Sequence, residues 1–322
     1  METKLINYKD LSIYRSELMG WSILWVMMLH FTFNQIKPLG FIAQYGFAGV
    51  DIFIFVSGFG LFHSLDKDDN IVHFYRKRLL RIFPTYYIIG FIINLILIHD
   101  DILTFLFRYS TLGFWIGCKY AEWFIPSIIL LYLIAPLFKK LFDKKKFFFI
   151  CISIIFFYFI AFFITDKEDI IDRSHFFLLY RIPSFIFGMT CAYWLKFHMP
   201  NNYFIYVMFL GFPFFLYFYP YHHQIYNFKY YSLAFLLPLF TTFFLSLSKC
   251  VKCLSPILKK IGAASLEIYL IQGAFFTLVL NGALSTYPEW HDILSILMIV
   301  ASIVLGIITH WLIDKSGLLR LL

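Results

Sequence analysis

Long apolar runs alternate with short polar connectors over most of this 322-residue chain. An α-helix needs about 20 predominantly apolar residues to cross the hydrocarbon core of a bilayer. Ten runs of about this length can be placed, at residues 18–36, 40–64, 82–99, 122–138, 147–165, 176–195, 203–219, 230–248, 262–282 and 293–313. The pattern therefore predicts an all-α polytopic membrane helix bundle with about ten transmembrane helices. Residues 1–322 are expected to form a single membrane-embedded domain.

The composition agrees with a membrane protein. Hydrophobic residues make up 61% of the chain and charged residues 14%, whereas a soluble domain has about one quarter charged residues. The net charge is +8, but the basic residues are spread over short connectors, which favours membrane orientation over a nucleic-acid partner. Among five scattered cysteines, the close pair Cys250 and Cys253 has no second pair beside it, so no metal site is expected.

The distribution of lysine and arginine predicts the orientation of the bundle. One alternate set of connectors, which includes both ends of the chain, holds twenty of these residues, and the other set holds six. Basic residues collect on the cytoplasmic side of a membrane. Both termini are therefore expected in the cytoplasm, and the protein in the cell membrane. A shorter apolar stretch at 102–115 predicts an interfacial or re-entrant helix on the outer side.

Two ionisable residues on consecutive predicted spans are expected at similar depth. His30 lies 12 residues beyond the start of its span and Asp51 lies 11 residues beyond the start of the next, which places them about 18 and 16 Å from opposite surfaces. A histidine beside a carboxylate inside a membrane is a candidate general base with its orienting partner. The alternative is a hydrogen-bonded pair that only joins two helices.

Three further acidic or basic residues lie in or at the predicted spans. Arg181 is about one turn inside its span and requires a carboxylate, a carbonyl or a ligand oxygen as partner. Glu267 lies within the ninth span, where it either serves a substrate site or only snorkels or pairs with a lysine. Glu122 opens the fourth span, at the expected interface with water.

A basic cluster precedes the third span. Arg78 and Arg81 are three residues apart, so they share a helix face, and Lys77 adds charge beside them. Arginines in this arrangement suit phosphate groups. Topology determination and contact with anionic lipid is the alternative interpretation.

Small residues mark one face of the second span. Gly49, Ser57 and Gly60 are spaced so that they lie near one side of a helix. Such a face lets another helix or a ligand chain approach the backbone closely.

Taken together, these stretches resemble the bacterial integral-membrane acyltransferase 3 family. Each motif is weak alone, but they follow one another in the family's order along the chain. They are LMG at 18–20 with LHF at 29–31, GVDIF at 49–53 with SGF at 57–59, RLLRIFP at 78–84, WFIP at 123–126 with LY at 131–132, YRIP at 180–183, and SLEIYL at 265–270.

The resemblance implies ten membrane helices and transfer of an acyl group, commonly acetyl from acetyl-coenzyme A. The acceptor would be a hydroxyl of a cell-surface polysaccharide or of a lipid-linked sugar. It also implies that His30 is catalytic and that Arg78 and Arg81 meet the donor's phosphates on the cytoplasmic side.

Two positions depart from the family pattern. The family often has an arginine eleven residues before the catalytic histidine, where this chain has Met19. Either Arg15, one helical turn lower, reaches the same pocket and helps bind the donor, or that role is absent. The family's motif in the ninth span often ends in a histidine two residues after SLEIYL, where this chain has Gln272. An amide can hydrogen-bond but cannot exchange protons.

The expected mechanism has His30, held by Asp51, remove the acceptor's proton as its oxygen attacks the thioester. Ser57, Asn34 or Arg181 is the expected oxyanion donor, and a covalent acyl-histidine is a further route. Two other classes stay open. A transporter or flippase would use the same buried charges as a substrate path, and a non-catalytic scaffold would not need His30 or Asp51.

Overall fold

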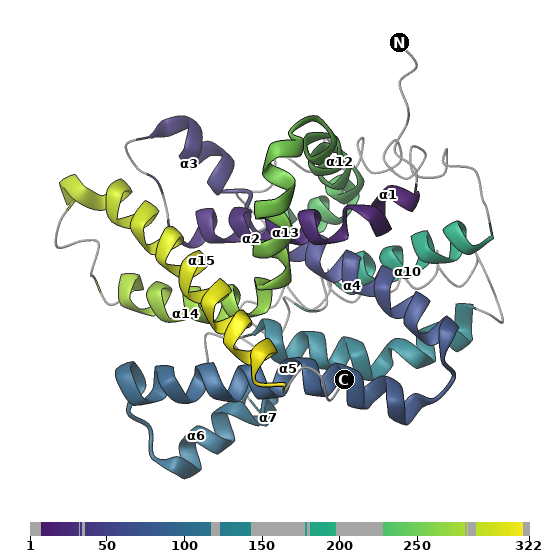
Figure 1. Cartoon of the computed structure of the whole chain (residues 1–322), viewed down its shortest axis with the longest axis horizontal. Helices are drawn as coiled ribbons and strands as arrows, with labels where there is room; N and C mark the ends of the chain where they lie inside the picture. The colour runs from purple at the N-terminus through teal and green to yellow at the C-terminus, as the bar shows by residue number, and fades with distance from the viewer. Residues whose placement is uncertain are drawn as a thin grey trace. The chain divides into compact units, whose positions relative to one another are not determined.

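The computed structural model describes residues 8–31, 33, 36–116, 123–142, 178, 181–197, 228–280, 282 and 288–317. Every regular element within these residues is helical (Figure 1), which confirms the all-α prediction for this part of the chain. Two compact units are present. The first comprises Met1–Arg15, Asp51–Phe74 and Trp123–Lys252, and the second comprises Ser16–Val50, Tyr75–Glu122 and Cys253–Leu322. The single domain stays a prediction.

Helices α4 and α10 form the centre of the first unit. They meet at backbone distance, since a Cβ atom at Gly58 would lie 2.2 Å from the Phe185 carbonyl oxygen and one at Gly188 would lie 2.0 Å from that of Phe55. Glycine at a helix crossing permits this approach. The helices of this unit are α1 (Tyr8–Ile13), α4 (Ala48–Lys67, from Asp51 on), an unlabelled helix Phe124–Phe142, α10 (Ile182–Lys196) and α12 (Phe228–Cys250).

Helices α14 and α15 lie side by side in the second unit (Figure 1). Helix α2 crosses α13 at backbone distance, because a Cβ atom at Gly262 would lie 1.9 Å from the Ser16 carbonyl oxygen. The elements of this unit are α2 (Arg15–His30), α3 (Lys37–Ala43), α5 (Ile71–Ile93, from Tyr75 on), the π-helix η1 (Asn94–Ile98), α6 (Ile102–Tyr109), α7 (Leu112–Trp115), α13 (Ser255–Ala263), α14 (Ser265–Leu280), η4 (Pro288–Trp290) and α15 (His291–Lys315), with η3 (Lys252–Leu254) at the junction of the units.

Four helices of the described residues are long and apolar enough to cross a membrane: Ala48–Lys67, Ile71–Ile98, Phe124–Phe142 and His291–Lys315. The pair Lys252–Ala263 and Ser265–Val279, bent by 72°, makes a fifth if it forms one broken span. These helices indicate a multi-pass membrane protein. The predicted spans at 147–165 and 203–219 lie outside the described residues, and ten helices with cytoplasmic termini stay a prediction.

The first two predicted spans are wrong in their bounds. Helix α2 ends at His30, and α4 begins only at Ala48. Between them α3 forms a separate short helix, which the Trp25 indole fixes by donating a 2.8 Å hydrogen bond to the Ile42 carbonyl. His30 is therefore the last residue of α2, and Asp51 lies in the first turn of α4. The depth argument assumed two unbroken helices, so it does not hold as stated.

The ninth span is also broken. Residues 262–282 were predicted as one helix, but the chain bends between α13 and α14 at Ala264, and α14 starts at Ser265. The breaks at residues 44–47 and at Ala264 contain no proline and lie among apolar residues, so the sequence does not mark them clearly.

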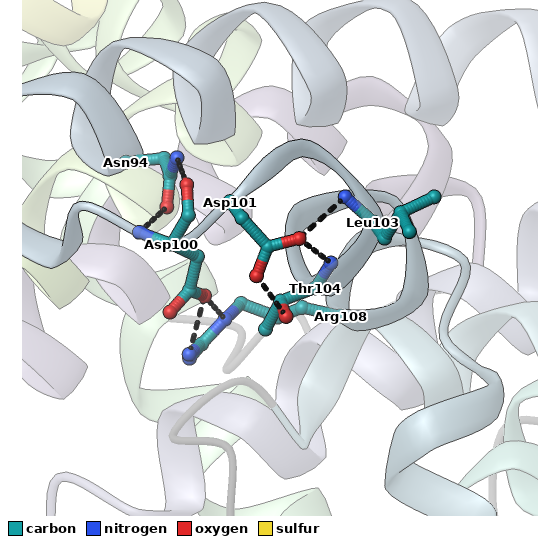
Figure 2. A network of polar contacts seen from close by, with 6 residues as sticks. All are labelled: Asn94, Asp100, Asp101, Leu103, Thr104 and Arg108. Carbon is teal, nitrogen blue, oxygen red and sulfur yellow. Dashed lines mark hydrogen bonds and ion pairs between the residues drawn. The ribbon is translucent and has the colours of Figure 1, made fainter.

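A network of polar contacts joins α5 to α6 (Figure 2). Asn94 holds Asp100 through two 3.1 Å hydrogen bonds, one from its amide to the Asp100 carbonyl and one from the Asp100 amide to its side chain. Arg108 closes the turn with two contacts of 2.8 and 2.7 Å to the Asp100 carboxylate. The turn therefore fixes where α6 leaves α5.

Asp101 begins α6. Its carboxylate accepts hydrogen bonds from the Leu103 and Thr104 amides at 3.0 and 3.2 Å and from the Thr104 hydroxyl at 2.6 Å. These hydrogen bonds, that of the Thr104 side chain first, hold the pKa of Asp101 below its ordinary value. Eight residues are too few to cross a membrane, and Leu103 and Leu106 are exposed. The interfacial or re-entrant placement of this stretch stays a prediction.

Candidate functional site

A buried ion pair lies in the first unit. Asp51 and Arg181 are each only 2% exposed, and Arg181 Nε is 3.9 Å from Asp51 Oδ2. The Ser184 hydroxyl donates a 3.1 Å hydrogen bond to the other carboxylate oxygen. The guanidinium also lies 4.6 Å from the centre of the Trp123 ring, a cation–π distance. Of the partners expected for Arg181, the structure thus supplies a carboxylate, that of Asp51.

The two helices that meet in this unit explain the pair. Arg181 immediately precedes α10, and Asp51 lies in the first turn of α4, where the helix dipole favours a carboxylate. The glycine contacts between α4 and α10 bring these two helices together. The pairing of Asp51 with His30 stays a prediction, because His30 belongs to the other unit.

His30 rests against α14 in the second unit. Its ring centre lies 4.7 Å from that of Phe276, with the planes tilted by 30°, and the Gln272 side chain lies beside it. Gln272 and Phe276 are four residues apart, so one face of α14 presents both to the imidazole. His30 Nδ1 is buried and has no hydrogen-bond partner among the described residues. The ring is thus packed beside two side chains of α14, and its Nδ1 atom makes no hydrogen bond within the described residues.

A second polar cluster lies on the same helix. Glu267 is completely buried, and its Oε1 atom is 3.0 Å from His310 Nδ1 and 3.8 Å from Arg81 Nη1. Arg81 also donates a 3.1 Å hydrogen bond from Nη2 to the Ala263 carbonyl. The interpretation that Glu267 snorkels or pairs with a lysine is therefore wrong. Its partners among the described residues are an arginine of α5 and a histidine of α15.

Helix α14 thus brings together three residues predicted from the sequence, which are its own Glu267, Arg81 of α5 and His30 of α2. Glu267 contacts Arg81, and five residues further along the helix, a rise of about 7.5 Å, Gln272 contacts His30. Arg81 keeps 33% of its side chain exposed. The second unit therefore holds a candidate base and a partly exposed guanidinium of the kind that binds phosphate.

Two residues of these clusters were missed from the sequence. His310 received no functional weight because it stands alone in an apolar span, and its partner lies 43 residues away. Glu17 directly precedes the first predicted span and was not singled out from the sequence. It is 1% exposed, accepts a 2.8 Å hydrogen bond from the Ser255 hydroxyl and lies 3.5 Å from Lys259 Nζ. Glu17 therefore joins the first turn of α2, the helix that ends at His30, to α13.

The remaining predicted site residues that the structure describes are partly or fully exposed. Arg78 is partly buried and Lys77 is exposed, both in the first half of α5. In the first unit, the Arg15 guanidinium lies 3.3 Å from where a Cβ atom of Gly60 would be, and Ser57 of α4 is partly exposed.

The small-residue face of α4 is confirmed as a site of close approach at Gly49, where a Cβ atom would lie 2.5 Å from the Ser22 carbonyl oxygen of α2. Asn34 and Glu122 lie outside the described residues. Within the described ranges, no group of three histidine, cysteine, aspartate or glutamate side chains could hold a metal ion.

Comparison with known proteins identifies the family. A family model described as "Acyltransferase domain" matches residues 18–315. A curated viral protein, "Putative acetyltransferase ORF330" of Acidianus two-tailed virus, is 28% identical over 179 residues, which cover 53% of this chain and 52% of the viral protein. The chain therefore spans about half the length of that relative. No solved structure matches the chain. Because the family match covers nearly the whole chain and includes all six motifs, the chain belongs to the acyltransferase 3 family.

Proposed function

We propose that this protein is a membrane O-acyltransferase that moves an acetyl group from cytoplasmic acetyl-coenzyme A to a hydroxyl of a cell-surface polysaccharide or lipid-linked sugar. Family membership supports acyl transfer. The observation that carries the proposal is the His30 imidazole, which packs beside Phe276 and Gln272 of α14 while Nδ1 stays without a partner among the described residues. A general base needs such a held ring with one free nitrogen.

His30 is the proposed base. The ring nitrogen that carries no hydrogen takes the proton of the acceptor hydroxyl while the hydroxyl oxygen attacks the thioester carbonyl carbon. The tetrahedral intermediate then breaks its carbon–sulfur bond. The thiolate leaves and takes the proton from the imidazolium, so that the enzyme returns to its starting state with an ester and a free thiol as products. This direct route needs no acyl-enzyme.

Asp51 and Arg181 are proposed to act as a unit. The Ser184 hydroxyl holds the carboxylate, and the carboxylate faces the guanidinium. A guanidinium so placed suits an oxyanion or the acceptor's hydroxyl groups. Ser57 and Asn34 remain proposed alternatives for the oxyanion, and Glu122 a proposed acceptor contact.

The donor is proposed to bind at the cytoplasmic basic cluster of Lys77, Arg78 and Arg81. Arg81 supports this assignment because one third of its side chain stays exposed although the group makes two contacts in the protein. Arg15 is proposed to assist in place of the arginine that Met19 replaces. Surrounding membrane lipids and the glycan acceptor are the proposed partners.

A labelling experiment tests the function. Purified protein in sealed lipid vesicles is incubated with acetyl-coenzyme A labelled in the acetyl group, with and without a crude lipid-linked glycan fraction. Acyl transfer predicts release of free thiol together with label on the glycan. Passage of label across a membrane without thiol release would show a transporter instead, and neither event would indicate a scaffold.

A further inference from the structure

The Glu267 carboxylate joins three helices of the second unit and is fully buried. Its Oε1 atom contacts His310 of α15 at 3.0 Å and Arg81 of α5 at 3.8 Å, while Glu267 itself belongs to α14. The side chain is 0% exposed. Burying a carboxylate is costly unless partners compensate it. His310 and Arg81 therefore compensate the buried carboxylate and hold α14 against α15 and α5.

The Arg81 guanidinium contacts the protein through Nη1 and Nη2, and part of the side chain is exposed to solvent. Nη2 donates to the Ala263 carbonyl at 3.1 Å, and Nη1 faces Glu267 at ion-pair distance. A guanidinium has five N–H donors in one plane, and 33% of this side chain is exposed. Donors thus remain for an anion that approaches from solvent, with the orientation of the plane already fixed.

His310 has a different position from Arg81. It contacts Glu267 through Nδ1 and is 24% exposed. Because its hydrogen bond to Oε1 is shorter than the Arg81 contact, the histidine is the group that fixes the carboxylate, and the carboxylate in turn fixes the arginine.

We propose that His310 and Glu267 are positioning residues for the acyl donor, and that they orient Arg81 toward a phosphate group of that donor. This inference rests on the proposed function, since it takes a phosphorylated thioester as the substrate. Neither residue touches the reacting atoms in this assignment. His310 acts through Glu267, and Glu267 acts through Arg81.

Electrostatics alone predicts the opposite effect, which makes the proposal testable. A carboxylate next to a phosphate site repels the ligand, so neutralising Glu267 would tighten donor binding if charge alone mattered. If Glu267 instead orients Arg81, Glu267→Gln weakens donor binding in spite of the lost repulsion.

The experiment compares His310→Leu, His310→Asn and Glu267→Gln in the full-length protein in nanodiscs. For each variant, the donor KM and kcat are measured with acetyl-coenzyme A, and coenzyme A binding is measured directly by isothermal titration calorimetry. Asparagine places its amide nitrogen close to the position of Nδ1, so it keeps the donor to Glu267. Thermal unfolding of each variant reports whether the protein is folded.

The matched control is His291→Leu. His291 contacts the carboxylate of Asp292 at 3.2 Å, so it forms the same kind of pair at the opposite end of α15. The two histidines are 19 residues apart, or about 28 Å along the helix. Loss of a histidine–carboxylate pair in general would affect both variants alike.

We expect His310→Leu and Glu267→Gln to raise the donor KM and the coenzyme A Kd about tenfold with kcat nearly unchanged, the change that loss of one oriented ionic contact produces. His310→Asn should restore binding to within about twofold of wild type, the difference that KM measurements resolve. His291→Leu should leave KM unchanged.

An unchanged KM in His310→Leu, or tighter binding in Glu267→Gln, would overturn the proposal. If the wild type binds coenzyme A but transfers nothing, the proposed function fails, and the Kd values of the variants still decide the positioning role. If the wild type does not bind coenzyme A, both are overturned.

Discussion

Neutralising Asp51 should cost far more stability than neutralising an acidic residue on the surface of the same helix. Asp51→Asn keeps the size of the side chain and an oxygen that accepts the Ser184 hydrogen bond, but it leaves the Arg181 charge buried without its carboxylate. The substitution therefore isolates the charge from the shape of the residue.

The magnitude follows from burial. Breaking a buried ion pair by removing one partner costs about 3–5 kcal/mol. The pair here is separated by 3.9 Å, too long for a hydrogen bond, and the Trp123 ring continues to face the guanidinium, so the lower end applies. We expect a loss of about 3 kcal/mol in the free energy of unfolding.

A double-mutant cycle separates the pair from its surroundings. Asp51→Asn combined with Arg181→Met removes both charges of the pair, so the combined loss should fall short of the sum of the single losses by about 2 kcal/mol. Unfolding is followed by titration with sodium dodecyl sulfate in mixed micelles, with circular dichroism as the signal.

Asp66→Asn is the matched control. Asp66 is the next acidic residue of α4 after Asp51, and it pairs with Lys196 at 2.7 Å where both side chains are partly exposed. A surface pair of this kind contributes about 0–1 kcal/mol. If Asp51→Asn costs no more than Asp66→Asn, or if the two substitutions of the cycle are additive, the buried pair does not stabilise the first unit as argued.

Three further predictions concern other parts of the chain. Gly262→Ala should destabilise the protein by about 1–3 kcal/mol because its Cβ atom would overlap the backbone of α2, whereas Gly273→Ala, which meets nothing within 4 Å, should be neutral or stabilising in the same unfolding titration. The hydrogen bonds to Asp101 depress its pKa below the ordinary value of 3.8. Protection of the α6 amides from hydrogen exchange should therefore be complete above pH 3.8 and be lost as the pH falls through the depressed pKa. Asp101→Asn should abolish this pH dependence. Replacing Arg78 and Arg81 together by glutamine should raise the donor KM at unchanged membrane insertion, and an insertion defect with normal KM would favour the lipid interpretation.

Within the described residues, the sequence predicts where helices occur better than where they break. The final span, expected at 293–313, lies within α15 at His291–Lys315, because a long apolar run in a charge-poor chain leaves few alternatives. The break between α3 and α4 was missed because the chain turns through residues that are mostly apolar, and 43 phenylalanines make every window resemble a buried helix. Tertiary contacts, such as that of Trp25 with Ile42, decide where these helices end.

Apart from the pair of His30 with Asp51 and the basic cluster before the third span, the candidate site was predicted as single residues. A charge inside an apolar run is visible in the sequence and implies a partner, which is why Arg181 and Glu267 were found. Their partners were not readable, since Asp51 precedes Arg181 by 130 residues and His310 follows Glu267 by 43. Helix packing, to which glycine contacts contribute, selects these pairs, and no local pattern encodes it.

Gln272 shows how a departure from the family pattern acquires a role in the structure. The amide cannot exchange protons, yet it lies beside the His30 side chain. Its position on α14, one turn from Phe276, suits a residue that orients the imidazole.

The most direct test of the account is the rate of acyl transfer by His30→Ala, measured as thiol release coupled to label on the acceptor, with coenzyme A affinity and thermal unfolding recorded on the same preparation. Loss of a general base predicts a fall in rate of at least about 100-fold, while the coenzyme A Kd and the unfolding temperature stay close to those of the wild type. Normal acylation by the folded variant would contradict the assignment of His30 as the base.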